Sequence, residues 1–276
     1  MIFDKKLKFF NELKAVEAFI ERQINLSKRY LGWEIVFLFY SLVNTLTIGL
    51  IAVGMSNGNS INEKQILYLV IGALMWGFLS VIFNEIANSI AYERWEGTIE
   101  HTFMAPISRF THLGGVSIFA IIYGLIRTII ILSLASLFFG LSFENANYFG
   151  ALIVILASCL SFLGLGLIAA VLPLLSPEKG SQATHIMEGL LLLVSGIYYP
   201  ITSLPKWLQH FSYISPATYT LEGVRKALLE GTKTTELLPI IYKELILAIF
   251  LIPLGLIIFS IGETYAKKVG LLKRNG

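Results

Sequence analysis

Long stretches with few or no charged side chains dominate this sequence. A helix of about 20 apolar residues crosses the ~30 Å hydrocarbon core of a bilayer. Because an unpaired backbone group is very costly in lipid, each spanning stretch must be helical. The sequence therefore predicts six transmembrane helices, within residues 33–53, 65–84 and beyond, 110–139, 145–177, 183–199 and 245–262.

The composition also favours a membrane protein over a water-soluble one. Hydrophobic residues make up 55% of the chain and charged residues 14%, whereas soluble domains carry about 25% charged residues. The mean hydropathy is +0.73. So little polar surface cannot cover a soluble globule, and we expect one all-α, polytopic membrane domain over residues 1–276, with the six-helix part at 33–262.

Basic residues predict the orientation of the chain. Seven Lys and Arg residues precede the first apolar stretch, and four more lie in the predicted tail, residues 263–276. Cytoplasmic segments are enriched in Lys and Arg, and six spans place both termini on one side, so we expect both to be cytoplasmic. Residues 201–243 are also basic although this topology places them outside, and longer segments follow the rule less strictly.

Two further segments are expected to be helical without spanning the membrane. Within residues 1–32, apolar side chains recur every three or four positions, which predicts an amphipathic helix on the inner membrane surface. A soluble helix packed on a partner would use the same face. The second helix is expected over residues 216–229, with Ser215 as N-cap, Pro216 in the first turn and Gly231 after the end.

The sequence lacks the motifs of the common catalytic and metal sites. It contains no G-x-x-x-x-G-K-[ST] phosphate loop, no HExxH, no CxxC and no GxSxG. The four histidines are dispersed, and Cys159, the single cysteine, lies in an apolar run and is expected to be a small core residue. We therefore expect no catalytic residue, no metal site and no bound cofactor, and any ATP must bind to a separate chain.

The turn between the second and third stretches is the most informative polar segment. Residues 84–108 contain four glutamates in a chain otherwise short of charge. Trp95, Ile99 and Phe103 are spaced as one helical stripe beside Glu96 and Glu100. Such a stripe suits docking into a groove of a partner protein. A helix lying back on the membrane would show the same pattern.

Three motifs in this order resemble those of type-2 ABC exporter permeases. Residues 93–100, ERWEGTIE, followed by APIS at 105–108, are similar to the E-R-x-x-G-T-L-E…P-[IL]-S signature. Residues 195–208 resemble the S-G-x-x-[FY]-P…LP-x-W segment after the fifth span. Residues 215–225 resemble the P-x-x-[YH]-x-x-E-x-x-R helix that follows. Trp95 and His101 depart from the usual pattern of the first motif.

The resemblance implies a helical membrane subunit that pairs with a second copy or a related chain and with two ATP-binding subunits, which carry ATP and Mg. It implies a re-entrant, extracellular helical segment over residues 199–225 and a prokaryotic plasma (inner) membrane as the location. Lipid surrounds such a subunit, and no nucleic-acid partner is expected. The ATPase-coupling residues would be Tyr92, Glu93, Arg94, Trp95, Glu96, Gly97, Thr98, Ile99, Glu100 and Phe103.

Arg127 is the one charge near the middle of an apolar stretch. An isolated charge there is costly, so its side chain should face protein or water rather than lipid. It is either a substrate or gate residue or a structural residue, bound to Glu85, to Glu188 or to carbonyls of a neighbouring helix. The other pathway candidates are Glu188, Tyr198, Tyr199, Pro200 and Trp207, of which the aromatic ones also suit an interfacial belt.

Four functions fit these patterns to different degrees. The first is the permease subunit of an exporter driven by a separate ATPase, with a hydrophobic or amphipathic drug or metabolite as cargo, because the predicted spans are nearly all apolar. Export of a lipid-linked saccharide is the second. An ion-coupled transporter or channel would place more ionisable residues at mid-membrane depth. A membrane anchor would not need the acidic turn.

Overall fold

The structure is a computed structural model that describes residues 2–55, 63–143, 145–176 and 179–272. All regular secondary structure in these ranges is helical, which confirms the predicted all-α class. The elements are α1 (Ile2–Arg29), α2 (Leu31–Met55), α3 (Glu63–Glu96), α4 (Ile99–Met104), α5 (Arg109–Phe139), α6 (Tyr148–Leu175), α7 (Gly180–Val194), a 3-10 turn (Ile201–Ser203), α8 (Lys206–Ser212), α9 (Pro216–Leu229) and α10 (Thr234–Val269).

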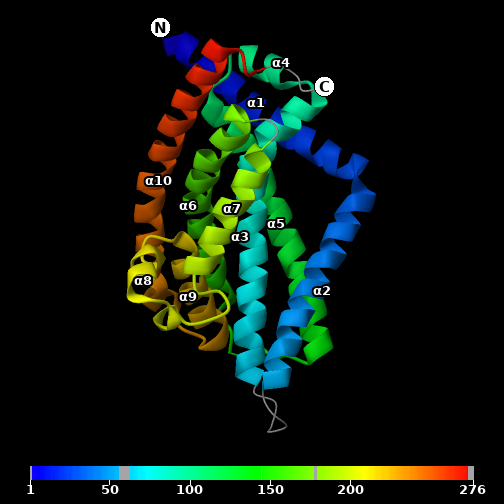
Figure 1. Ribbon diagram of the computed structural model, residues 1–276, viewed down its shortest axis with the longest axis vertical. Coiled ribbons are helices and arrows are strands. Elements are labelled where there is room, and N and C mark those ends of the chain that lie inside the picture. Colours follow the sequence, from blue (N-terminus) through cyan, green and yellow to red (C-terminus); the bar gives the residue numbers. More distant parts are fainter. Residues whose placement is uncertain (1, 56–62, 144, 177–178, 273–276) are drawn as a thin grey trace.

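Five helices in the described ranges are long and apolar enough to cross a membrane: α2, α3, α5, α6 and α10. Each covers one of the predicted stretches. They run alongside one another, and α1 and α4 lie at one end of the molecule while α8 and α9 lie toward the other (Figure 1). The first residues of α1 and the last turn of α10 share the end that carries α4.

The fifth predicted span is shorter than the sequence indicated. Helix α7 has 15 residues, which at 1.5 Å per residue reach about 22 Å and fall short of the ~30 Å core. The helix ends at Val194 because Gly196 adopts a left-handed conformation with φ of 67° and Pro200 follows, so the prediction of helix through Tyr199 is wrong. Length and composition support five spans among the described residues, and the six-span topology stays a prediction.

The last helix is longer than the predicted span over residues 245–262. Helix α10 begins at Thr234 and continues to Val269, so the predicted tail starts inside the helix. The charge at Glu244 set the predicted start, but the Glu244 side chain is fully buried. It accepts hydrogen bonds from Ser161 Oγ at 3.0 Å and from Thr220 Oγ1 at 2.9 Å. Because both oxygens of the carboxylate have partners, the helix can carry it through the core.

Helices α3 and α6 form the centre of the bundle. The largest fully buried side chains are phenylalanines on α3, α6 and α10, namely Phe78, Phe83, Phe162 and Phe259. Helices α6 and α10 pack closely at two glycines. A Cβ atom on Gly164 would lie 2.6 Å from the backbone carbon of Leu251, and one on Gly255 would lie 2.7 Å from the Gly164 carbonyl oxygen. These positions therefore require glycine for the two helices to touch.

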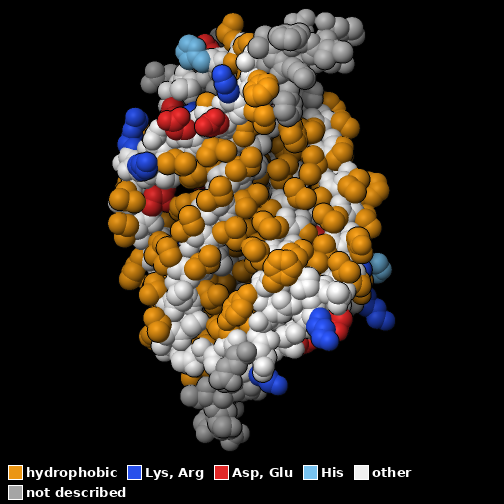
Figure 2. Space-filling model, turned by 180° about the vertical axis from the view of Figure 1, so that it is seen from behind, with side chains coloured by type: hydrophobic (Ala, Val, Ile, Leu, Met, Phe, Trp, Pro, Cys, Tyr) orange, Lys and Arg blue, Asp and Glu red, His pale blue; other side chains and the backbone are white. Residues whose placement is uncertain are grey.

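An apolar belt covers the middle of the molecule. Figure 2 shows hydrophobic side chains over most of one face, with charged side chains gathered toward its two ends. Helix α2 carries many of the exposed large residues, including Trp33, Phe37 and Phe39, and α10 exposes Ile249 and Phe250. An exposed apolar surface of this extent suits contact with lipid or with another subunit.

The two predicted non-spanning helices are both present. Helix α1 packs on α5, where a Cβ atom on Gly115 would lie 2.7 Å from the Cβ of Phe19. Leu13 and Ile24 of its predicted apolar stripe are exposed. Helix α9 starts at Pro216 after the N-cap residue Ser215, although no side-chain cap bond forms.

Candidate functional site

The acidic turn between α3 and α5 is built around a break in the helix. Helix α3 ends at Glu96, and Gly97 takes φ of 75°, a value that glycine adopts without strain. The Thr98 amide then donates to the Glu93 carbonyl at 2.8 Å. The short helix α4 follows, and α5 begins after Ser108, whose side chain accepts from the Thr111 amide. The turn therefore presents two separate helical pieces.

This break corrects the predicted apolar stripe. Trp95 is 69% exposed, whereas Ile99 and Phe103 are buried in the core of the chain itself. Because Gly97 interrupts the helix between Glu96 and Ile99, the three side chains do not form one face, and the prediction of a continuous docking stripe is wrong. Exposed side chains of the turn include Trp95, Glu100, His101 and Met104, of which Met104 is 85% exposed.

Glu93 lies at the centre of a buried polar cluster. Its side chain is 2% exposed, and Oε1 accepts from Arg22 Nη1 at 2.8 Å and from Thr102 Oγ1 at 3.1 Å. The Nε2 atom of His112 lies 3.1 Å from the same oxygen, and the His112 side chain is 1% exposed. The ring of Phe19 contacts His112 with centroids 4.6 Å apart. Glu93 thus joins α1, α3, α4 and α5.

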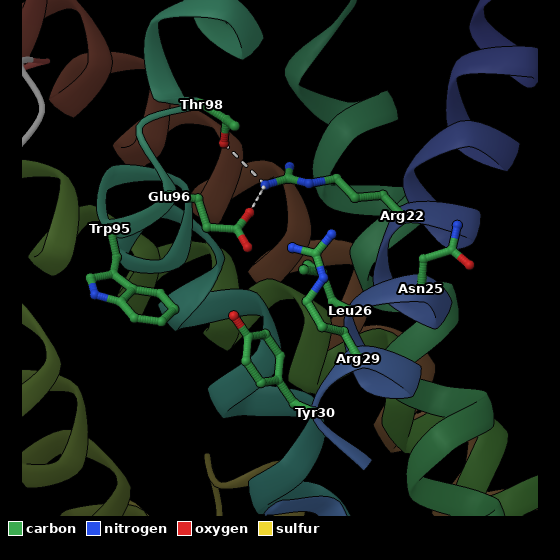
Figure 3. A pocket seen from close by; sticks show the side chains of 8 residues that line it. All are labelled: Arg22, Asn25, Leu26, Arg29, Tyr30, Trp95, Glu96 and Thr98. Carbon is green, nitrogen blue, oxygen red and sulfur yellow. Dashed lines mark hydrogen bonds and ion pairs between the residues drawn. The ribbon is translucent and has the colours of Figure 1, made fainter.

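Arg22 extends this cluster to the turn. Its second amine, Nη2, donates to Glu96 Oε2 and to Thr98 Oγ1, both at 3.1 Å (Figure 3). Burial of the guanidinium opposes its charge, but the hydrogen bonds and charges of Glu93 and Glu96 outweigh this effect and raise the pKa of Arg22. Because guanidinium donors have a fixed planar geometry, Arg22 sets the distance between α1 and the end of α3.

Arg94 ties the same end of α3 to the opposite side of the bundle. The side chain is 2% exposed. Its Nη2 donates to the Leu174 carbonyl in the last turn of α6 at 2.7 Å, and Nη1 donates to the carbonyl of Leu271, just after α10. Carbonyls at helix C-termini lack partners within the helix, so the guanidinium satisfies acceptors that would otherwise be unpaired.

Arg109 holds α4 against α10. Its Nη1 and Nη2 donate to the carbonyls of Thr102 at 2.9 Å and Phe103 at 2.7 Å. Its Nε donates to Glu263 at 3.0 Å, and Lys267 Nζ lies 2.7 Å from the same carboxylate. Through these contacts, together with those of Glu93, Arg22 and Arg94, the turn is bonded to α1, α5, α6 and α10.

Six members of this network were absent from the predicted site: Arg22, Thr102, Arg109, His112, Glu263 and Lys267. Arg109 alone left a signal in the sequence. A cation in the first turn of a helix is unfavourable next to the positive end of the helix dipole, so an arginine directly after the APIS motif indicates a specific partner. Arg22 lies 71 residues from Glu93, and no spacing rule connects them.

The six predicted pathway residues do not form one site. Arg127 Nη2 donates to the Phe37 carbonyl of α2 at 2.7 Å and to Ser41 Oγ, as in the structural reading of this residue. Glu188 accepts from Ser80 Oγ on α3 and from Asn84 Nδ2 at 3.0 Å. Among the hydrogen bonds of the described residues, none joins two of the six candidates, which also include Tyr198, Tyr199, Pro200 and Trp207.

The connection between α7 and α9 is held by one arginine. Arg225 Nη2 donates to the Ile197 carbonyl at 2.6 Å and to the Tyr68 carbonyl of α3 at 3.2 Å, and its guanidinium lies 3.5 Å from the centre of the Tyr68 ring. Tyr199 donates its hydroxyl to the Leu193 carbonyl at 2.5 Å. Trp207 on α8 is exposed.

A cavity lies beside α1 in the described part of the chain. Its volume is about 580 Å³, and it is lined by α1 and the turn, with Arg22 and Glu96 pointing toward each other and Tyr30 and Trp95 on its wall (Figure 3). In the residues that the structure describes, no three His, Cys, Asp or Glu side chains lie close enough together to hold a metal ion.

Comparison with known families identifies the chain. The ABC-2 type transporter family model matches residues 15–229. The chain belongs to this family. The match covers α2 to α9 and includes the turn and its partners on α1, α5 and α6, so the protein is a type-2 ABC transporter permease and a multi-pass membrane protein.

Relatives of this permease include bacterial and plant proteins. The inner membrane transport permease YadH of Escherichia coli strain K12 is 25% identical over 223 residues, which cover 79% of this chain and 84% of YadH. The linearmycin resistance permease protein LnrN of Bacillus subtilis strain 168 is 25% identical over 59% of this chain and 42% of LnrN. ABC transporter G family member 41 of Oryza sativa subsp. japonica is 23% identical over 78% of this chain and 15% of that protein.

Proposed function

We propose that this permease is the membrane-spanning subunit of an ATP-driven exporter and that α4 receives the motion of a separate ATPase subunit. The sequence has no phosphate loop, so the ATP and Mg would be bound by that partner. Two copies of the chain, or this chain and a related one, would form the pathway. The family membership supports this arrangement, since ABC permeases work with ABC ATPases.

The network around the α3–α4 turn is the observation that carries the proposal. A coupling element needs an exposed surface for its partner and rigid bonds to the helices that move. Trp95, Glu100 and Met104 supply the exposed surface. Glu93, Arg94 and their partners supply the bonds to α1, α5, α6 and to the end of α10. We expect displacement of α4 to move these helix ends together.

The topology proposed for the permease has six spans with both termini cytoplasmic. The first residues of α1 and the last turn of α10 lie at the same end of the molecule, which requires an even number of crossings (Figure 1). Helix α7, followed by the α8–α9 segment, would supply the sixth crossing and return part of the chain into the outer leaflet. The basic content of α1 and of the last turn of α10 supports a cytoplasmic location for that end.

The proposed cargo is a hydrophobic or amphipathic small molecule. The exposed middle of the molecule is apolar (Figure 2), and cargo of this kind can enter from the membrane. LnrN is named as a resistance permease, and resistance conferred by a membrane permease is consistent with export.

The test is isolation of the tagged chain from its native membranes in mild detergent, followed by mass spectrometry and an ATPase assay. We expect a stoichiometric ATP-binding subunit. Glu100→Lys combined with Met104→Glu should abolish ATPase stimulation while the permease remains in the membrane. Lys206→Glu on α8 is the matched control, an exposed charge reversal at the other end, and should have no effect. A chain that is isolated alone and still transports in liposomes would show that the proposal is wrong and favour ion coupling.

A further inference from the structure

A second cavity is lined by residues of α1, α2, α3 and α5. Helix α2 diverges from α3 toward its junction with α1 (Figure 1). The volume of the cavity is about 400 Å³, within the range of small-molecule sites, which is about 300–1,000 Å³. Its wall combines aromatic rings from α2, α3 and α5 with carboxylates from α2 and α3. The members that matter here are Trp33, Glu34 and Phe37 on α2, Glu85 and Tyr92 on α3, and Phe119 on α5.

The carboxylates of this cavity differ in their partners. Glu34 accepts a hydrogen bond from the Tyr123 hydroxyl of α5. Glu85 accepts no hydrogen bond from any residue that the structure describes, although Glu34 and Arg127 both act on it electrostatically. Glu96, at the edge of the cavity, is paired with Arg22. Glu85 is therefore the carboxylate with capacity left for a ligand.

Carboxyl groups outnumber guanidinium groups around the cavity. Arg127 is the cation that acts on Glu85, and it donates its hydrogen bonds to the Phe37 carbonyl and to Ser41. Two carboxyl groups, those of Glu34 and Glu85, are present for this one guanidinium. The lining includes no Lys or Arg, and Arg29 belongs to the neighbouring cavity (Figure 3). One monovalent cation would balance the site.

The aromatic rings select what kind of cation fits. Rings of Trp, Tyr and Phe attract a cation placed over their faces, and this attraction grows when the site excludes water. They also offer apolar area to the rest of the ligand. Trp33 and Phe37 are more than half exposed, so the cavity opens toward the apolar surface of α2. A bare metal ion has no apolar body to place against this area.

We propose that this cavity binds a monovalent amphipathic organic cation, an ammonium or phosphonium group on an apolar body, that enters from the membrane. Its positive group lies between Glu85 and Glu34, and its apolar body lies against Trp33, Phe37 and Phe119. The role of this cation as cargo rests on the proposed exporter function, whereas its binding does not.

The probe is tetraphenylphosphonium, with tetraphenylborate as a ligand of the same shape and opposite charge. Binding is measured by equilibrium dialysis to the full-length chain in dodecyl maltoside, which carries no charge. We expect the phosphonium to bind at least tenfold more tightly than the borate. Glu85→Gln should weaken phosphonium binding about tenfold and reduce the preference for the cation. Glu222→Gln, an exposed carboxylate on α9, is the control and should bind as the unchanged chain does.

A second variant distinguishes loss of binding from loss of folding. Glu34→Gln can still accept the Tyr123 hydrogen bond, so it should stay folded by size-exclusion chromatography and also weaken binding severalfold. The proposal is overturned if phosphonium and borate bind equally, or if neither glutamine variant alters phosphonium binding. It is also overturned if phosphatidylethanolamine displaces the probe completely, since the site would then hold a lipid headgroup.

The outcome is separable from that of the proposed function. Binding is measured on the permease alone and needs no ATPase subunit. If the cation does not bind, two results of the other experiment are unaffected. These are the recovery of an ATPase subunit and the loss of ATPase stimulation in the α4 variant. Failure to recover an ATPase leaves the cation site in place and removes only its role in export.

Discussion

Both ends of the molecule are anchored by an arginine that donates to backbone carbonyls. At the α4 end, Arg94 reaches the carbonyls of Leu174 and Leu271. At the α8–α9 end, Arg225 reaches the carbonyls of Ile197 and Tyr68. The partners of both arginines named here are backbone carbonyls, and each arginine holds together segments that are far apart in sequence.

The two ends differ in what surrounds the anchor. The α4 end adds the buried carboxylates of Glu93 and Glu263 and the guanidinium groups of Arg22 and Arg109, which connect α1, α3, α4, α5 and α10. At the α8–α9 end, the remaining polar contacts include those made by hydroxyl groups, such as Ser195 Oγ to Ser215 Oγ at 2.8 Å and Thr220 Oγ1 to the buried carboxylate of Glu244 at 2.9 Å. Buried charge pairs are rigid and costly to separate. We infer that the α4 end moves as one body, whereas Arg225 and apolar packing hold the α8–α9 segment on α3.

The largest effect should come from removing the carboxylate at the centre of the α4 end. Glu93→Ala leaves the buried His112 and the half-buried Arg22 without this carboxylate and should lower the free energy of unfolding by about 3 kcal/mol. Unfolding in mixed detergent and SDS micelles measures the change. Glu96→Ala removes another carboxylate bound by the same arginine, but one that is more exposed, and should lower stability by about 1 kcal/mol. Equal losses of stability from Glu93→Ala and Glu96→Ala would show that the buried carboxylate of Glu93 is not the centre of the α4 end.

Arg94→Leu should have the next largest effect. It removes two charged hydrogen bonds to helix-end carbonyls and should destabilise the permease by about 2–3 kcal/mol. Hydrogen exchange should increase at the last turn of α6 and after α10, near Leu174 and Leu271. Arg94→Lys keeps the charge but not the planar donor geometry, so its stability should lie between those of the unchanged chain and of Arg94→Leu. Unchanged exchange at both segments would show that Arg94 is not an anchor.

Arg225→Leu should loosen the other end with a smaller loss of stability, about 1.5–2 kcal/mol. This variant is distinguished from the others by the part of the chain in which hydrogen exchange increases. Hydrogen exchange should rise over residues 195–229 and remain unchanged in α4, because no buried charge network connects the two ends in the described structure. Increased exchange in α4 as well would show that the ends are coupled more tightly than their contacts indicate.

The smallest effect should come from the exposed pair on α9. Glu222 and Lys226 lie 2.7 Å apart, and both side chains are more than 40% exposed. Such an i,i+4 pair contributes about 0.3–0.5 kcal/mol. Glu222→Ala should therefore change stability by no more than that, measured by the same unfolding titration in low and high salt. A loss above about 1 kcal/mol would mean that surface charge matters more here than burial.

The sequence predicts the helices of this permease well where a local rule applies. Charge-free stretches locate α2, α3, α5 and α6. The Ser215-Pro216 start and the Gly231 that follows α9 predict that helix, and the Glu222–Lys226 pair forms as its spacing indicates. Each of these features depends on residues within a few positions of one another.

The features that the sequence missed depend on contacts over long separations. The charge of Glu244 placed the predicted start of α10 too late. The hydroxyl groups of Ser161 and Thr220, which donate hydrogen bonds to this carboxylate, lie on other helices, so the local sequence does not show them. The spacing of Trp95 and Ile99 predicted one stripe, because nothing in the spacing shows that Gly97 breaks the helix. The coupling residues stay a prediction, but the structure shows which of them are buried and which a partner can reach.

The most direct test of the account is cross-linking from single introduced cysteines. Cys159 is buried and is the single native cysteine, so Cys159→Ser gives a background without thiols. Met104→Cys on α4 and Trp207→Cys on α8 then place one exposed thiol at each end. With a bifunctional maleimide reagent in native membranes, we predict that an ATP-binding subunit is cross-linked from position 104 and not from position 207. Cross-linking from position 207, or from neither position while the ATPase is still isolated with the permease, would contradict the assignment of α4 as the coupling element.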